Sequence, residues 1–221
     1  SAASDVYKRQ FLCFSPARSP VPYDDATNGK ANLLYHNVGN GQFVDVSEER
    51  GIDPNQKQFS WAAAWEDYDN DGDVDLYVSN DYGRNNLYRN EDGHFTDVAA
   101  QSGVEDIAAG MSVTWGDYNQ DGWVDLYVSN MFSAAGNRVT YQRQFRPGTS
   151  GHRQELFQRH ARGNSLFMNQ GDGTFADTSV SAAVTMGRWS WGSTFADINN
   201  DGLEDLLVSN GYMTSENQDD L

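Results

Sequence analysis

Bulky apolar residues and small residues alternate in three short segments of this chain, which begin near residues 59, 110 and 188. A period of two is typical of β-strands, in which successive side chains point to opposite faces of the sheet. The bulky positions are Trp61, Trp65, Met111, Val113, Trp115, Trp189, Trp191 and Phe195, and Ser, Gly, Ala or Thr lies between them. A sheet with one bulky and one small face stacks well on a copy of itself, as the blades of a β-propeller do.

Two sequence blocks alternate along the chain and define a repeat. The block W-E-D-Y-D-N-D-G-D-V-D-L-Y-V-S-N at 65–80 returns in related form at 115–130 and 195–210. The block L-Y-H-N-V-G-N-G-Q-F-V-D-V at 34–46 returns at 87–98 and 166–178. Each unit is predicted to form four strands: an approach strand, the V-S-N strand, the L-Y-x-N strand and the F-x-D strand. The pairs Asn40-Gly41, Asp92-Gly93 and Asp172-Gly173 supply the positive φ of tight hairpins.

The repeats predict an all-β fold, a partial β-propeller with blades of four antiparallel strands. Residues 59–98 and 110–178 are complete blades, the second with an insert at 131–163, whereas 31–46 and 188–210 are half blades. The blades together occupy 29–221. Residues 1–28 carry no acidic loop and are expected to be a non-repeat segment, artefactual or disordered. Because these blades do not close a ring, the chain is expected to be a fragment of a longer protein.

An acidic loop of nine residues joins the first two strands of each of three units. Oxygen donors occupy positions 1, 3, 5 and 9, Gly stands at position 6, and a backbone carbonyl at position 7 can add a further ligand. This pattern suits Ca²⁺, whose coordination shell is large and tolerant. The predicted ligands of about three sites are Asp67, Asp69, Asp71, Asp73, Asp75, Asp117, Asn119, Asp121, Trp123, Asp125, Asp197, Asn199, Asp201, Leu203 and Asp205.

Other interpretations of the loops are weaker. Mg²⁺ demands a stricter octahedron, and the loops contain no His or Cys for zinc or copper. An EF-hand needs Glu at position 12, where this chain has Val78, Val128 and Val208. Metal-free Asp-Gly turns are disfavoured, because the carboxylates of one loop repel each other by about 1 kcal/mol per close pair even in water.

The composition restricts the classes of binding partner and the cellular location of the protein. The formal net charge of −17, from 32 acidic and 15 basic residues, repels phosphate backbones and makes nucleic acid an unsuitable partner. A single cysteine, Cys13, excludes an intrachain disulfide, and no apolar run reaches the length of a membrane span. Bound calcium is therefore expected to stabilise the fold in place of disulfide bonds. Extracellular calcium modules bind at roughly 10⁻⁴ to 10⁻³ M, which predicts an extracellular, cell-surface or periplasmic location.

The D-x-[DN]-x-D-G-x-x-D loops followed by D-L-x-V-S-N, with the N-x-G-[DN]-G-x-F hairpins, resemble the FG-GAP/VCBS repeat family. With G-N-R-V-T-Y-Q at 136–142 and A-R-G-N-S-L-F at 161–167, the chain is similar to bacterial members of the cartilage-acidic-protein (ASPIC/UnbV) family. The resemblance covers about residues 30–221. It implies a seven-bladed propeller, like the integrin α head, with calcium held by the loop residues named above. The chain lacks the remaining blades and the C-terminal acidic domain typical of that family.

The insert at 131–163 is basic, and the strand order places it opposite the calcium loops, where propellers usually bind ligands. Its arginines could recognise an acidic glycan or a carboxylate through bidentate contacts. The alternative, which we favour, is that they neutralise the acidic blades and cover a sheet edge. They are Arg138, Arg143, Arg146, Arg153, Arg159 and Arg162, against the single acid Glu155.

We do not expect an enzyme. The chain has no G-x-S-x-G, H-E-x-x-H or phosphate-loop motif, and its regularly spaced carboxylates are assigned to metal. The predicted function is that of a calcium-binding extracellular propeller module for protein binding or adhesion, with an unidentified protein or glycan as ligand. The alternatives are a carbohydrate-binding module and an accessory domain of a larger secreted enzyme.

Overall fold

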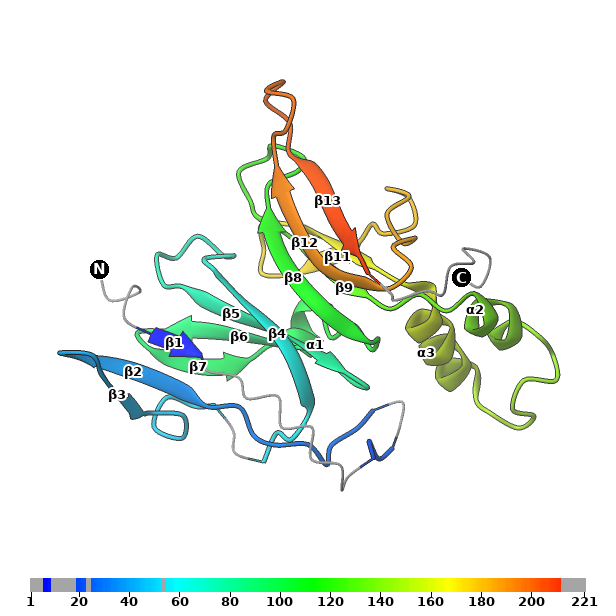
Figure 1. Cartoon of the computed structure of the whole chain (residues 1–221), viewed down its shortest axis with the longest axis horizontal. Coiled ribbons are helices and arrows are strands. Elements are labelled where there is room, and N and C mark those ends of the chain that lie inside the picture. The colour runs from blue at the N-terminus through cyan, green and yellow to red at the C-terminus, as the bar shows by residue number, and fades with distance from the viewer. Residues whose placement is uncertain (1–5, 9–18, 23–24, 53–54, 212–221) are drawn as a thin grey trace.

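The structure is a computed structural model that describes residues 6–8, 19–22, 25–52 and 55–211. Its strands form antiparallel sheets that follow one another in sequence order (Figure 1). The first sheet contains β1 (Val6–Lys8), β2 (Leu34–Gly39) and β3 (Gln42–Asp45). The second contains β4 (Phe59–Glu66), β5 (Asp75–Asp81), β6 (Asn86–Glu91) and β7 (His94–Asp97). The third contains β8 (Gly110–Gly116), β9 (Asp125–Asn130), β10 (Ser165–Asn169) and β11 (Phe175–Asp177), and the fourth contains β12 (Ser190–Ala196) and β13 (Asp205–Asn210).

The second and third sheets are up-and-down blades in which each strand pairs with the next along the chain. The predicted all-β architecture with four-stranded antiparallel blades is confirmed. The first strands of successive sheets lie side by side, because β8 contacts both β4 and β12. Within the described residues the sheets do not close into a ring.

Most of the segment 1–28 lies outside the described residues, and so do residues 212–221. The described part of that N-terminal segment nevertheless contacts the repeats. Strand β1 pairs with β2, with Tyr7 opposite Tyr35. Ala26 is fully buried, and its N–H donates a hydrogen bond of 2.6 Å to the carbonyl of Tyr82. These residues extend the first sheet and fix it to the first complete blade.

The approach strands differ from the prediction of strict alternation. Each carries a β-bulge near its start, between Ser60 and Ala62 in β4, and at the equivalent places in β8 and β12. A bulge inserts an extra residue and re-aims side chains. The extra residues are Trp61, Met111 and Trp191, and the rings of Trp61 and Trp191 approach to 6.0 Å between centroids although their strands are not neighbours. The alternation is regular only beyond the bulge.

Apolar residues form a core between each pair of successive sheets. Leu34 and Ile52 of the first sheet region pack against Leu76, Val78 and Tyr88 of the second. The core between the second and third sheets consists of Tyr68, Tyr77, Leu87, Val98, Ala99, Val104, Leu126, Val128, Phe167 and Phe175. The short helix α1 (Ala99–Ser102) contributes to it. The stacking of bulky on small residues holds at the next junction, where the ring of Phe195 lies against Gly116.

Two of the three hairpin predictions are confirmed in detail. Asn40 and Gly41 both have positive φ (54° and 73°), and so do Asp92 and Gly93 (54° and 84°), as a type I′ turn requires. The third is wrong, because positive φ occurs at Gly171 and Gly173 (71° and 82°) and not at Asp172, which makes the last hairpin a longer loop.

The insert folds into two helices, α2 (Ala134–Thr140) and α3 (Gly151–Arg162). Ser133 and Ser150 cap them, since each hydroxyl accepts a hydrogen bond from a backbone N–H of the first turn. The two helices lie at the opposite end of the third sheet from the loop that joins β8 to β9 (Figure 1). This agrees with the strand-order argument.

Candidate metal centre

The three acidic loops, called here loop I (67–75), loop II (117–125) and loop III (197–205), have the same backbone conformation. Position 4 is left-handed in each, with φ of 57° at Asn70, 58° at Gln120 and 60° at Asn200. Position 6 is a glycine with φ of 95°, 89° and 87° in turn, which a residue with a Cβ rarely adopts. Two positive φ values so close together reverse the chain between two strands.

The carboxylate at position 1 organises each loop from inside. Asp67 accepts hydrogen bonds from the N–H of Asp71 (3.1 Å) and of Gly72 (3.0 Å). Asp117 and Asp197 accept the equivalent pairs of bonds, at 3.0 and 2.9 Å and at 3.1 and 2.9 Å. The position 5 carboxylate accepts one from the N–H of position 7 in all three loops. The same polar contacts therefore fix all three loops.

Loop I gathers negative oxygens that the protein compensates only in part. Oxygens of Asp69 and of its neighbours Asp67 and Asp71 lie within 4.8 Å of one another. Oδ1 of Asp69 is buried and has no hydrogen-bond partner among the described residues. Burial and the charge of Asp71 raise the pKa of Asp69 above its usual value. An unpaired buried oxygen among carboxylates fits a hard divalent cation, and the all-oxygen donor set fits Ca²⁺.

In loops II and III the position 3 residue is Asn, which relieves this repulsion. The side-chain amide of Asn119 donates to Asp121 (2.8 Å), and that of Asn199 donates to Asp201 (3.0 Å). Their amide oxygens accept a hydrogen bond from the N–H of position 5. Both loops keep oxygen donors at positions 1, 3 and 5, and at these three positions together they carry one negative charge fewer than loop I.

The position 9 carboxylates lie beneath the loops and are tied to the backbone. Asp75 is fully buried and accepts hydrogen bonds from the N–H of Tyr68 (3.2 Å) and Asn90 (2.8 Å). Asp125 is also fully buried and accepts one from the N–H of Asn169 (2.8 Å). Burial raises the pKa of Asp75 and of Asp125 to about 7. A carboxylate held in this way gains from a nearby cation, which favours its charged form.

The remaining predicted ligands lie at or near the loop surface. Asp205 is half-buried and accepts a hydrogen bond from the N–H of Ile198 (3.2 Å). The side chain of Asp73 accepts a hydrogen bond from the N–H of Asp92 (2.7 Å). The backbone carbonyl of Asp73 therefore remains as the predicted metal ligand. At the same position 7, the ring of Trp123 lies beside Gly171, and Leu203 is exposed.

Sequence reasoning missed a set of amide side chains that connect the loops to the sheets and to one another. Asn90 and Asn169 are the asparagines of the L-Y-x-N motifs. The side-chain amide of each donates a hydrogen bond to the backbone carbonyl of the residue before the position 9 Asp, at 3.0 and 3.1 Å. Asn70 and Gln120 reach from one loop to the next. The recurrence of Asn in the L-Y-x-N block was the signal that could have identified the first pair.

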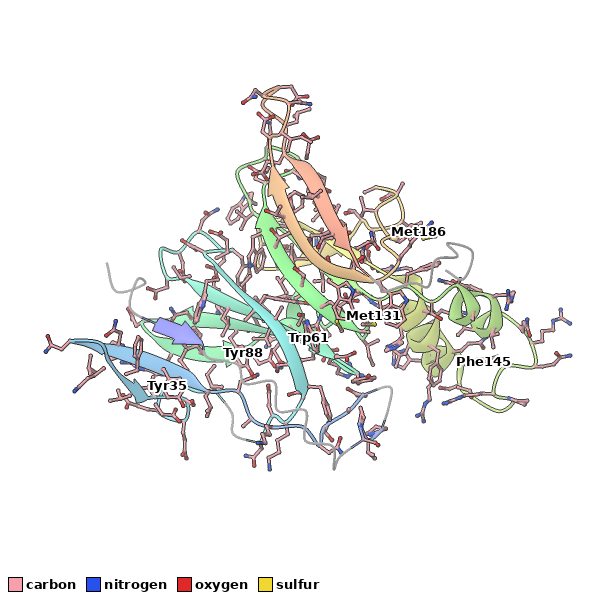
Figure 2. All side chains as sticks on the ribbon, in the orientation of Figure 1. Tyr35, Trp61, Tyr88, Met131, Phe145 and Met186 are labelled. Atoms are coloured by element: carbon pink, nitrogen blue, oxygen red, sulfur yellow. The ribbon has the colours of Figure 1, made fainter. Side chains whose placement is uncertain are left out.

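The arginines of the insert separate into two groups. Arg159 contacts the buried carboxylate of Asp106 (3.0 Å), and Arg162 contacts Asp177 (2.9 Å), so both attach α3 to the blades. In the second group, the guanidinium of Arg146 lies over the ring of Phe157 (4.4 Å). Arg146 and Arg153 line a surface pocket of about 440 Å³ with residues 147–150. Arg138 lies in the last turn of α2, and Arg143 follows that helix. Figure 2 shows Phe145 in this part of the molecule, beside α3.

Comparisons with known proteins agree with the repeat structure. A model of the FG-GAP-like repeat matches residues 25–78, 67–128 and 153–208. Cartilage acidic protein 1 of Mus musculus is 28% identical over 189 residues, which cover 85% of this chain and 26% of that protein. Cartilage acidic protein 1 of Homo sapiens is 36% identical over 80 residues, 34% of this chain and 12% of that protein. The chain thus spans about a quarter, or less, of the relatives it matches. Among the described residues, no helix has the length and apolar character to cross a membrane.

Proposed function

The chain belongs to the FG-GAP-like repeat family, and on that basis we propose that it is a calcium-binding propeller module for protein binding or adhesion outside the cell. The observation that carries the proposal is the oxygen cluster of loop I, with the unpaired buried oxygen of Asp69. Loops II and III repeat the backbone form of loop I, with Asn in place of Asp69. A net charge of −17 adds a general attraction for cations.

Calcium in this proposal is structural. It supplies positive charge between the two strands that each loop joins, and so stabilises the edge of the blade. Positions 1, 3 and 5 provide side-chain oxygens, and position 7 provides a backbone carbonyl. The position 9 carboxylate either supports the loop by accepting backbone hydrogen bonds or is itself a ligand of the ion. The expected ligands of loop I are Asp67, Asp69, Asp71, Asp73 and Asp75. The equivalent residues of loops II and III follow the same order.

Several properties support the location and the role. Sites of this affinity class fill at millimolar calcium, the concentration outside cells or in a periplasm. Two curated relatives carry the name cartilage acidic protein, and a propeller without catalytic motifs is suited to binding. We propose that the module is non-catalytic and that its ligand is a protein. A carbohydrate-binding module and an accessory domain of a larger secreted enzyme are the alternatives.

The test is thermal unfolding of the full chain in EDTA and in millimolar Ca²⁺, with calorimetric titration to count the sites. A ligand of the native state stabilises by RT ln(1 + [L]/Kd), about 0.4 kcal/mol per site when the calcium concentration equals Kd and about 1.4 kcal/mol at a tenfold excess. We expect about three sites and a higher unfolding midpoint, with a weaker effect of Mg²⁺. Asp71→Asn should remove one site, whereas Asp172→Asn, at an exposed hairpin Asp, should remove none. A midpoint that ignores calcium, together with an absence of binding heat, would show that the loops are metal-free turns.

The pocket lined by Arg146 and Arg153 supports a second candidate, the binding of an acidic glycan or of carboxylates by the insert. The probe is a uronic-acid oligosaccharide, titrated into the full chain at low and high salt. Arg153→Gln should weaken binding, and Arg188→Gln, at an exposed turn outside the insert, should not. Equal affinities of the two variants would reject the site.

A further inference from the structure

Hydrogen bonds connect loop I to loop II and loop II to loop III. The side-chain amide of Asn70, at position 4 of loop I, donates to the carbonyl of Gly122, at position 6 of loop II (3.3 Å). In the same way the amide of Gln120 in loop II donates to the carbonyl of Gly202 in loop III. The contact thus occurs twice, between the same two loop positions.

A second connection between loops I and II is buried. Asp75 of loop I accepts the N–H of Tyr68, and the carbonyl of Tyr68 accepts a hydrogen bond of 2.8 Å from the side-chain amide of Asn169. The backbone N–H of Asn169 in turn donates to Asp125 of loop II. The ring of Tyr68, 2% exposed, stacks on Trp115 of the neighbouring blade at 6.4 Å between centroids. The two position 9 carboxylates are therefore connected by three hydrogen bonds, through the residues Tyr68 and Asn169.

We propose that the three loops bind calcium with positive cooperativity, and that Asn70, Gln120 and Asn169 are the positioning residues that couple neighbouring sites. The inference rests on the calcium binding proposed above and adds to it the way in which the sites communicate.

The physical reason lies in which peptide groups the amides hold. Asn169 holds the carbonyl of the peptide that joins Tyr68 to the ligand Asp69. Asn70 holds the carbonyl of the peptide that precedes the position 7 carbonyl of Trp123. An ion in loop I orders residues 68–70, and these residues then order loop II, so the second ion meets a lower cost of ordering. The coupling is reciprocal by thermodynamic necessity.

Calorimetric titration of the full chain with Ca²⁺ alone tests the coupling. We expect a Hill coefficient above 1. With loop III disabled by Asp201→Asn, disabling loop I by Asp71→Asn should weaken binding at loop II about fivefold or more, the lower end of typical coupling. In the presence of Asn70→Gly, the same step should weaken binding at loop II by a smaller factor, because only the bond from Asn169 then connects the two loops. Glycine is chosen because it accepts the positive φ of position 4 without strain.

Matched variants separate the coupling from general damage to a loop. Asn200→Gly makes the same change in loop III, where no bond to a further loop occurs among the described residues, and it should leave the Hill coefficient intact. Asn169→Ser and Asn90→Ser both lose the amide bond within their own blade, but only the first loses a bond to the preceding loop. Only Asn169→Ser should lower the Hill coefficient, and far-ultraviolet circular dichroism checks that both variants fold.

The outcomes are distinguishable. Calcium binding with independent sites, or an equal response of Asn70→Gly and Asn200→Gly, overturns the coupling and leaves the proposed function in place. A complete absence of calcium binding overturns both proposals.

Discussion

The ion pair between Arg159 and the buried Asp106 is one of the contacts that attach the insert to the propeller. The side chain of Asp106 is 0% exposed and that of Arg159 is 29% exposed, with 3.0 Å between Oδ1 and Nε. Replacement of Arg159 by Met keeps most of the volume but leaves a buried carboxylate without its counter-charge. Loss of one partner of a buried pair costs about 3–5 kcal/mol. Asp106 keeps a hydrogen bond from the amide of Asn130 (2.9 Å), so we expect the lower end of that range.

The assay is urea unfolding at neutral pH in saturating Ca²⁺, so that the metal contribution stays constant. Arg159→Met should lower the free energy of unfolding by about 3 kcal/mol and the midpoint of thermal unfolding by about 6–12 °C. The double variant with Asp106→Asn removes the unpaired charge and should recover part of the loss. The two substitutions should therefore be non-additive by more than about 1.5 kcal/mol. A loss below about 1 kcal/mol, or additive effects, would show that the pair is solvated and that the helices dock through other contacts.

Two further predictions concern a half-buried acid and the junction between blades. Burial raises the pKa of Asp81 to about 6, against about 3.9 in an unfolded chain. The unfolded state therefore loses its proton first, and the stability falls as the pH rises from about 4 to 6. Asp81→Asn should stabilise by about 1–2 kcal/mol at pH 8, allowing for partial exposure, and by little at pH 4, measured by urea unfolding in EDTA; equal gains at both pH values would contradict the pKa. A Cβ at Gly116 would lie 2.6 Å from the ring of Phe195 in the next sheet. Gly116→Ala should cost about 1–3 kcal/mol through overpacking, whereas Gly151→Ala, which meets open space, should change the stability by less than about 0.5 kcal/mol.

Sequence-based expectation failed in particular places for a physical reason. A period of two places Trp61 on the same face as Trp65, but a bulge breaks the register and brings the Trp61 ring to Trp191. Periodicity cannot show such a bulge, because it depends on how successive strands meet. The Asp-Gly pair at 172–173 resembles the one at 92–93, yet Gly171 gives the chain a further residue that accepts positive φ, and the loop lengthens.

The sequence by itself determined the local structure and the candidate chemistry of this protein. Side-chain period, turn residues and repeated blocks are local properties, and they were sufficient for the strands, the blades and the acidic loops. Tertiary structure alone decided how these units contact one another and attach. Asn169 bonds to Tyr68, 101 positions away in the sequence, and Arg159 of the insert pairs with Asp106 of a loop between blades. Such contacts depend on how the sheets stack. No local pattern of residues predicts which residues far apart in the sequence come into contact.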